Sequence, residues 1–152
     1  MSGEGPLVSV AVVTHGRPAL LPLLLEQFDV QSHSRRELVI LDDSPTPCRP
    51  LAQLGRDDVR YRHLRERLPV GSKRNLILEL LRGELVCQWD DDDHYAPGYL
   101  AHAVRQLQEA DFVKLDRWFV HDPEGGSFGW WDTREAPAGM PAAEAAACVE
   151  QN

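Results

Sequence analysis

Apolar runs alternate with leucine-rich segments of helical spacing along the first two thirds of the chain. The runs at residues 7–13, 37–41 and 84–89 are short and mostly apolar, which is typical of strands buried in a parallel sheet. Apolar side chains recur at helical spacing after each run, at residues 20–28, 76–81 and 100–107. This alternation predicts an α/β fold, with a mostly parallel central sheet and helices on both of its faces.

Three further segments extend this prediction. Residues 59–64 alternate polar and apolar side chains, which indicates a strand with one solvated face, nearer the edge of the sheet. Residues 111–115 predict another short strand, and residues 49–54 predict a short helix. The helix that opens at residues 71–75 is expected to end at Gly83.

The last third of the chain has a different pattern. Two aromatic segments, residues 118–120 and 128–131, predict a hairpin closed by the turn formers at residues 122–126. Adjacent Trp residues there are typical of a core or a lid, and they can also stack on a sugar ring. Residues 136–152 are Ala-rich with few large apolar side chains, which predicts a weak helix or a disordered tail. We therefore expect one folded domain at residues 1–135, followed by this tail.

Composition and charge narrow the classes of function. The chain has 152 residues, enough for one domain, and a formal net charge of -8. That charge argues against a nucleic-acid or anionic-membrane binder, although a bound metal ion can still attract a nucleotide. The three cysteines are far apart in the sequence, so no disulfide framework is expected. We expect a reducing, cytoplasmic compartment instead. No segment has the length and apolarity of a signal peptide or a transmembrane segment.

Four consecutive aspartates, Asp90, Asp91, Asp92 and Asp93, follow one of the predicted strands directly. In an open α/β sheet, ligands bind in the crevice beyond the carboxyl ends of the strands. Clustered carboxylates at that place suit a hard divalent cation, Mg²⁺ or Mn²⁺, which would hold the phosphates of a substrate. The alternative is a solvated acidic turn. Because Trp89 and an apolar run precede the acids, we favour the metal site.

A second acidic strand end lies at Asp42 and Asp43, after the run at residues 37–41. These residues form either a turn or helix cap, or an acceptor for hydrogen bonds from a nucleotide's base or ribose. Thr14, at the end of the first predicted strand, either caps the next helix or touches the ligand. His15 and Arg17 are interpreted as surface residues by default.

Two cations, Lys73 and Arg74, fall in the first turn of a predicted helix. They oppose the helix macrodipole at a cost of ~0.3–1 kcal/mol each, which a solvated pair can tolerate. The better explanation is an anion, which the amino terminus of a helix also favours. Arg74 can grip a diphosphate with its planar fork, whereas Lys73 would act as a point charge.

Taken in order, these segments resemble the family 2 glycosyltransferases, which have the GT-A fold. The resemblance covers residues 7–120 and rests on the segments V-S-V-A-V-V-T-H-G-R-P, L-V-I-L-D-D-S, G-S-K-R-N, R-G-E-L and W-D-D-D-D-H-Y-A-P-G-Y-L. Each segment alone is weak evidence, because a D-x-D motif is common by chance. Their order and spacing together are specific.

The resemblance implies an inverting transfer of sugar from a nucleoside diphosphate sugar, with UDP-sugar favoured, assisted by Mn²⁺ or Mg²⁺. The metal would act as a Lewis acid on the leaving diphosphate. The implied nucleotide-sugar-binding residues are Thr14, Asp42, Asp43, Lys73, Arg74, Asp90 and Asp91, and the implied metal ligands are Asp92 and Asp93. Within this set, Asp43 would hydrogen-bond the base, and Asp91 would lie near the ribose.

The sequence departs from the family after this region. Members of the family continue well past this length, and their later half carries the acceptor site and a carboxylate base. Asp132 is the candidate base, although it lies in no pattern that matches the family. The alternative function is therefore a non-catalytic or partial sugar-nucleotide-binding domain that needs a partner or a further C-terminal half. The donor sugar and the acceptor, a sugar or a lipid-linked group, are not identified.

Incomplete packing would leave an apolar surface exposed near Trp118, Phe119, Trp130 and Trp131. Self-association through that surface, as a homo-oligomer, is an expectation of the same argument. A nucleotidyltransferase is disfavoured, because such enzymes carry a Gly-rich phosphate loop after the first strand and this chain has only Gly16 there.

Overall fold

The computed structural model describes residues 5–107, 110–122 and 124–134. The chain separates into two compact units, residues 1–108 and 109–152, and each is described by itself. The predicted boundary after residue 135 stays a prediction, because the tail at residues 136–152 lies outside the described residues.

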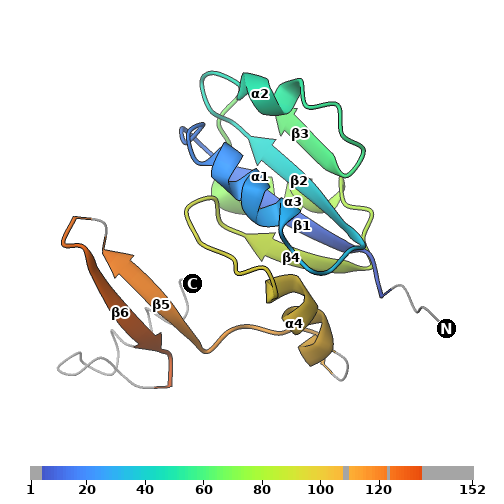
Figure 1. Ribbon diagram of the computed structural model, residues 1–152. Helices are drawn as coiled ribbons and strands as arrows, with labels where there is room; N and C mark the ends of the chain where they lie inside the picture. The colour runs from blue at the N-terminus through green and yellow to red at the C-terminus, as the bar shows by residue number, and fades with distance from the viewer. Residues whose placement is uncertain (1–4, 108–109, 123, 135–152) are drawn as a thin grey trace. The chain divides into compact units, whose positions relative to one another are not determined.

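The first unit is built on a parallel sheet of four strands in the order β3-β2-β1-β4 (Figure 1). The strands are β1 (Val8–Thr14), β2 (Arg36–Asp42), β3 (Val59–His63) and β4 (Leu85–Trp89). The helices are α1 (Leu21–Asp29), α2 (Arg49–Ala52), α3 (Val70–Leu78) and α4 (Tyr99–Gln106). The predicted α/β fold with a mostly parallel sheet is confirmed.

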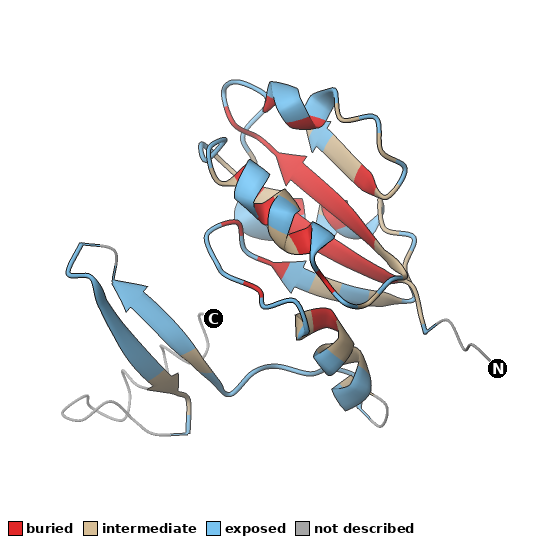
Figure 2. Cartoon of the chain, viewed as in Figure 1, coloured by how far each residue is buried: buried red, intermediate tan, exposed pale blue. Residues whose placement is uncertain are grey.

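Helices cover both faces of this sheet, as expected. Figure 1 shows α1 in front of the sheet and α3 behind it. One apolar cluster joins a face of β1 and β2 to α1, α2 and α4, and includes Val12, Phe28 and Leu100. A smaller cluster joins the other face to α3 through Leu41 and Ile77. The central strands β1 and β2 are therefore almost wholly buried (Figure 2).

Two expectations about strands are wrong. β4 was expected to be a buried strand, but it is an edge strand whose side chains alternate in burial, and Val86 is 53% exposed. The exposed side chains, Val86 and Gln88, line a pocket beside α3 instead of packing beneath a helix. Residues 111–115 form no strand, because this segment has no ladder partner, and Phe112 is exposed. The prediction that residues 59–64 lie at an edge is confirmed by β3.

Gly83 does not end α3, which stops five residues earlier at Leu78. Its role is a close approach between chain segments. A Cβ atom at this position would lie 2.6 Å from the backbone nitrogen of Ser9 and 2.7 Å from the Leu7 carbonyl oxygen. The Gly83 amide donates to Ser9 Oγ at 2.8 Å. Glycine is required here because any side chain would push β4 away from β1.

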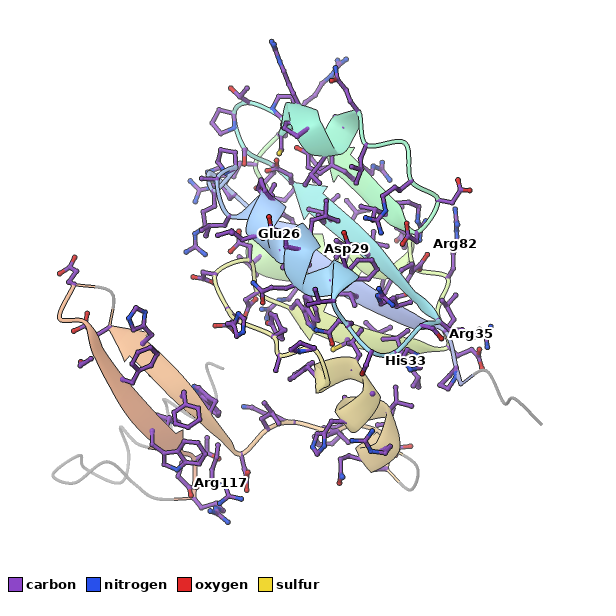
Figure 3. All side chains as sticks on the ribbon, viewed as in Figure 1. Glu26, Asp29, His33, Arg35, Arg82 and Arg117 are labelled. Atoms are coloured by element: carbon purple, nitrogen blue, oxygen red, sulfur yellow. The ribbon has the colours of Figure 1, made fainter. Side chains whose placement is uncertain are left out.

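The amino-terminal end of the sheet contains a buried carboxylate with a structural role. Glu37 accepts from Ser9 Oγ at 2.6 Å, from the backbone amide of Arg82 at 2.7 Å and from Arg60 Nη2 at 2.9 Å. Burial alone would raise the pKa of Glu37, but these partners outweigh it and hold the pKa below its usual range. Arg82 itself lies at the outer rim of this end (Figure 3).

The second unit contains a two-stranded hairpin, β5 (Arg117–Asp122) and β6 (Ser127–Asp132), as predicted. Pairs of aromatic rings cross between the strands: Phe119 with Trp130, and Trp118 with Trp131. Phe119, Phe128 and Trp130 are each more than half exposed, so these rings form no core within the described residues (Figure 2). A membrane-spanning helix is likewise absent from the part of the chain that the structure describes.

Candidate functional site

The carboxyl ends of the strands meet at one edge of the sheet. In the parallel register, Thr14 of β1 pairs with Asp42 of β2, and Asp42 pairs with His63 of β3. Val12 pairs with Trp89 of β4, which places the acidic loop, residues 90–95, beside the end of β1. The two acidic strand ends therefore flank Thr14, at the edge where open α/β sheets bind their ligands.

Asp43, at the end of β2, is a buried carboxylate in which both oxygens are engaged. Its Oδ1 accepts from Lys73 Nζ at 2.7 Å and lies 3.0 Å from His15 Nδ1, and its Oδ2 accepts from the Leu68 amide at 2.8 Å. Burial would raise the pKa of Asp43, but the hydrogen bonds from Lys73, Leu68 and His15 outweigh it and lower the pKa. Asp43 is thus an ionised anchor inside the protein.

Both carboxylate oxygens of Asp42 also accept hydrogen bonds from the protein. Its Oδ1 accepts from the amide and the hydroxyl of Ser44, and its Oδ2 accepts from the Tyr61 hydroxyl at 2.5 Å. Burial, together with the hydrogen bond to Asp42, raises the pKa of Tyr61 well above its usual range. Ser44 also holds the first loop, because its hydroxyl accepts from the Gly16 amide at 2.7 Å. Gly16 has a φ of 69°, a left-handed conformation that favours glycine.

Thr14 connects the two acidic strand ends. Its hydroxyl donates to Asp91 Oδ2 in the acidic loop, and its carbonyl oxygen accepts from Lys73 Nζ at 2.9 Å. Lys73 is buried and donates to Asp43 with the same ammonium group. A continuous network thus runs from β2 through α3 and β1 to the loop after β4. Thr14 is neither a helix cap nor an isolated polar residue.

Arg17 lies between two carboxylates of the acidic loop. Its Nη1 donates to Asp91 Oδ1 at 2.7 Å and lies 2.8 Å from Asp92 Oδ2. The hydrogen bond to Asp91 and the charges of both aspartates raise the pKa of the guanidinium. The side chains of Arg17 and Asp92 are 49% and 52% exposed, whereas that of Asp91 is 5% exposed. Arg17 and His15 do lie at the surface, as the default interpretation has it, but both also contact the acids at the strand ends.

Aromatic stacking shapes the acidic loop. The rings of Trp89 and Tyr95 stack in parallel with centroids 4.1 Å apart, and the Asp90 amide donates to the Tyr95 hydroxyl at 2.8 Å. The loop is therefore closed on itself, with Asp90, Asp92 and Asp93 exposed around it. Although Asp93 is exposed as a residue, its carboxyl group is partly buried, and this desolvation, with the charges of Asp90 and Asp92, raises the pKa of Asp93. Such crowding favours a nearby cation.

The adjacent residues Lys73 and Arg74 contact acids at different strand ends, Lys73 after β2 and Arg74 after β4. Lys73 points into the protein toward Asp43, whereas Arg74 is half-exposed and its Nη2 lies 3.6 Å from Asp90 Oδ1. Successive residues of a helix are separated by about 100°, so adjacent positions cannot face the same partner. The structure brings Arg74 to the exposed acids and removes Lys73 from the surface.

Two glutamines hold the acidic loop, and the sequence analysis missed them: Gln27 lies in α1, and Gln31 lies two residues past the end of that helix. Gln27 Oε1 accepts from the Tyr95 amide at 2.6 Å, and Gln31 Nε2 donates to the Ala96 carbonyl at 2.9 Å. Gln31 Oε1 also accepts from the Leu100 amide at 3.1 Å. Gln31 Nε2 also lies 3.2 Å from the Gln27 carbonyl oxygen, so the two glutamines lie next to each other on the side of the loop. The available signal was a pair of amide side chains at the end of an apolar helical segment.

The acidic loop can supply some of the ligands of a divalent metal ion, with the others coming from a substrate and from water. Over the described ranges, no three or more His, Cys, Asp or Glu side chains are gathered closely enough to hold a metal. Asp91 and Asp92, however, converge on one nitrogen of Arg17. Bound Mg²⁺ usually takes one or two carboxylates and completes its shell with substrate phosphates and water. The pair fits that pattern, whereas the Asp93 carboxylate accepts from the Tyr95 hydroxyl at 3.4 Å.

The sequence profile of Glycosyl transferase family 2 matches residues 9–141, most of the chain. The chain belongs to this family. The resemblance seen in the strand-end motifs is thereby confirmed, and the match extends through both units of the structure.

Known relatives of this family 2 chain are longer. YwdF of Bacillus subtilis (strain 168), an uncharacterized glycosyltransferase, is 26% identical over 110 residues, which cover 72% of this chain and 41% of YwdF. The S. aureus TarS 1-349 structure in complex with UDP-GlcNAc has 25% identity and a TM-score of 0.60, and the match covers 68% of this chain and 31% of TarS. The structure of the mannosyltransferase PcManGT of Pyrobaculum calidifontis in complex with GDP-Man and Mn2+ is 19% identical, with a TM-score of 0.64. The match covers 96% of this chain and 52% of PcManGT, and it supports the GT-A fold.

Asp132 of this family 2 chain lies in the second unit. Its carboxylate accepts from Arg134 Nε at 2.8 Å and pairs with Arg134 Nη2 at 2.5 Å. The hydrogen bond from Arg134 lowers the pKa of Asp132 to about 2. A carboxylate with that pKa is a weak proton acceptor. The role of Asp132 as the catalytic base stays a prediction.

Proposed function

We propose that this family 2 chain binds a nucleoside diphosphate sugar together with Mn²⁺ or Mg²⁺ and transfers the sugar with inversion. One observation carries the proposal. A buried ionic network fixes Asp91 from inside, while Asp92, Arg17 and Arg74 face solvent at the same sheet edge. Such an edge offers carboxylates for a metal and cations for a diphosphate. The complexes of TarS with UDP-GlcNAc and of PcManGT with GDP-Man and Mn2+ favour the same ligand class.

Asp92 stays a proposed metal ligand, and we propose Asp91 beside it in the place that the sequence analysis gave to Asp93, with the diphosphate as a further ligand. A bound divalent ion would neutralise the charge that develops on the leaving diphosphate. Asp90 and Asp93 add negative charge around the pair and raise the local affinity for a cation. Thr14 acts as a positioning residue, since its hydroxyl fixes the orientation of Asp91.

The basic residues of α3 have separate proposed roles. Arg74 can fork onto a phosphate at the amino terminus of the helix, where backbone amides also favour an anion. Lys73 supports the nucleotide site from beneath, because it holds Asp43 and the Thr14 carbonyl in place. Asp43, with Asp42, forms the floor on which we place the nucleoside. A UDP sugar is the favoured donor.

Transfer to an acceptor requires a base that takes the proton of the acceptor hydroxyl. This chain aligns with only 41% of YwdF, and its candidate base is tied to Arg134. A partial sugar-nucleotide-binding domain that needs a partner or further residues is therefore the second candidate function. Slow hydrolysis of the donor without transfer would distinguish it. We also propose a cytoplasmic location, because Cys48 and Cys87 are free thiols.

Calorimetry with UDP, GDP and dTDP sugars, with and without Mn²⁺, tests this proposal. We expect at least one donor to bind more tightly with Mn²⁺ present. Asp92→Asn should remove most of that metal dependence, and the matched control Glu26→Gln should not, because Glu26 is an exposed acid on α1 (Figure 3). Metal-independent binding that is equal in parent and Asp92→Asn would contradict the proposed metal site.

A further inference from the structure

Arg17 occupies the position that two carboxylates offer to a cation. One nitrogen, Nη1, lies 2.7 Å from Asp91 Oδ1 and 2.8 Å from Asp92 Oδ2. A divalent ion that bridged the same two oxygens would lie about 2.0–2.6 Å from each of them. The guanidinium and such an ion therefore cannot hold these oxygens at once.

The two partners of Arg17 differ in mobility. Asp91 is buried and also held by the Thr14 hydroxyl, so its position does not depend on Arg17. Asp92 and the Arg17 side chain are half-exposed and can turn toward solvent. The backbone around Arg17 is held at both ends, because Gly16 donates to Ser44 Oγ and Leu20 donates to the Arg17 carbonyl. Only the side chain needs to move.

From this geometry we infer that Arg17 is an internal counter-ion that the metal ion displaces, and that the released guanidinium then binds the donor's diphosphate. The inference rests on the proposed metal site. In the absence of ligand, Arg17 neutralises Asp91 and Asp92 and keeps the acidic loop ordered. When a metal takes over these carboxylates, Arg17 remains tethered beside them, and its planar fork suits the arriving phosphates.

Two effects of removing Arg17 on metal affinity oppose each other. The metal would lose a competitor, which raises its affinity, and the carboxylates would lose a partner that holds them together, which lowers it. Competition should win, because Thr14 fixes Asp91 and the stacked pair of Trp89 and Tyr95 fixes the loop without Arg17. Donor affinity in saturating metal should change in the opposite direction. Opposite changes in the two affinities are the signature of displacement.

The test measures Mn²⁺ binding to the full chain by the loss of the free Mn²⁺ electron paramagnetic resonance signal. We expect Arg17→Gln to bind Mn²⁺ about tenfold more tightly than the parent, the factor that two part-exposed ion pairs represent together. The matched control is Arg74→Gln, which removes the same charge from a side chain that lies against Asp90 and the Gln88 amide rather than between the two carboxylates that Arg17 bridges. It should change Mn²⁺ affinity much less. Arg17→Lys, which keeps the charge without the fork, should fall between parent and Arg17→Gln.

A second measurement follows UDP binding at saturating Mn²⁺, where Arg17→Gln should bind several-fold more weakly than the parent. Equal Mn²⁺ affinity in parent and Arg17→Gln, or weaker binding in the variant, overturns this inference and leaves the metal site intact. If neither protein binds Mn²⁺, the proposed metal function falls, and this inference falls with it. Thermal melts without metal check folding, and a modest decrease for Arg17→Gln is expected because Asp91 and Asp92 lose their counter-ion.

Discussion

The ends of β2 and β4 carry the same residue type in the same place of the fold, yet they differ in how exposed their acids are and in which partners these acids have. Asp42 and Asp43 are buried, and the protein itself occupies both oxygens of each. The acids after β4 are mostly exposed, and Arg17 is shared between two of them. An acid whose partners are all fixed within the fold acts as a structural anchor, whereas an acid whose cation is half-exposed and shared is available to a ligand. The comparison teaches that availability is set by neighbours rather than by residue type.

Removing the Lys73–Asp43 ion pair at the end of β2 should have the largest effect on the free energy of unfolding. Lys73→Met would leave the Asp43 carboxylate buried without its ammonium partner, and removal of one member of a buried pair costs ~3–5 kcal/mol. Arg74→Met, one residue away and half-exposed, should change the free energy of unfolding by only ~0–1 kcal/mol. Urea unfolding of both variants measures the difference. Equal losses in the two variants would mean that the anchor at β2 is no stronger than a surface pair.

The next largest effect is expected at Thr14, which connects the acids after β2 with those after β4. Thr14→Val keeps the shape of the side chain but removes the hydroxyl that donates to Asp91. We expect a loss of ~1–3 kcal/mol in stability, because Asp91 would be left buried with one partner fewer. Metal affinity should fall by ~10–100-fold, as is common when a partner of a metal ligand is lost. Thr14→Ser retains the hydroxyl and should preserve metal binding; a similar loss in both variants would argue against a role for that hydroxyl.

The contribution of Asp43 to the stability of the fold should depend on pH. The pKa of Asp43 is lowered in the folded state, so its ionised form stabilises the fold above the usual pKa of 3.8, and that contribution is lost as the pH falls through the lowered value. The difference in free energy of unfolding between the parent and Asp43→Asn should therefore be largest near neutral pH and shrink below about pH 4. Chemical unfolding at a series of pH values measures it. A difference that is constant with pH would show that Asp43 is not an ionised anchor.

The smallest expected effect concerns Arg74. Arg74→Gln should leave the melting temperature unchanged, because the contact with Asp90 is long and exposed. It should weaken UDP binding by about threefold, in keeping with the ~0.2–1 kcal/mol of exposed charge pairs. Calorimetry with UDP, and with uridine as the control ligand without phosphates, measures this change. An equal loss for uridine would place Arg74 away from the diphosphate.

The sequence was sufficient for the sheet and for the location of the acids, because apolar runs mark the strands and the acids follow them directly. It could not distinguish Asp43 from Asp92, since burial at a strand end depends on which distant cation reaches it. The inward direction of Lys73 depends on where α3 begins, which a sequence fixes only to within a few residues. The exposure of β4 was missed because an apolar run looks the same in an edge strand as in a central one.

The tryptophans offer an optical consequence of this arrangement. Trp89 is fully buried and stacked on Tyr95 at the base of the acidic loop, whereas Trp118, Trp130 and Trp131 all lie in the partly exposed hairpin. These four are all the indole rings of the chain. A soluble quencher such as iodide should therefore dim the hairpin's fluorescence first and leave mainly the emission of Trp89. The remaining signal would report directly on events at the strand ends, without any attached dye.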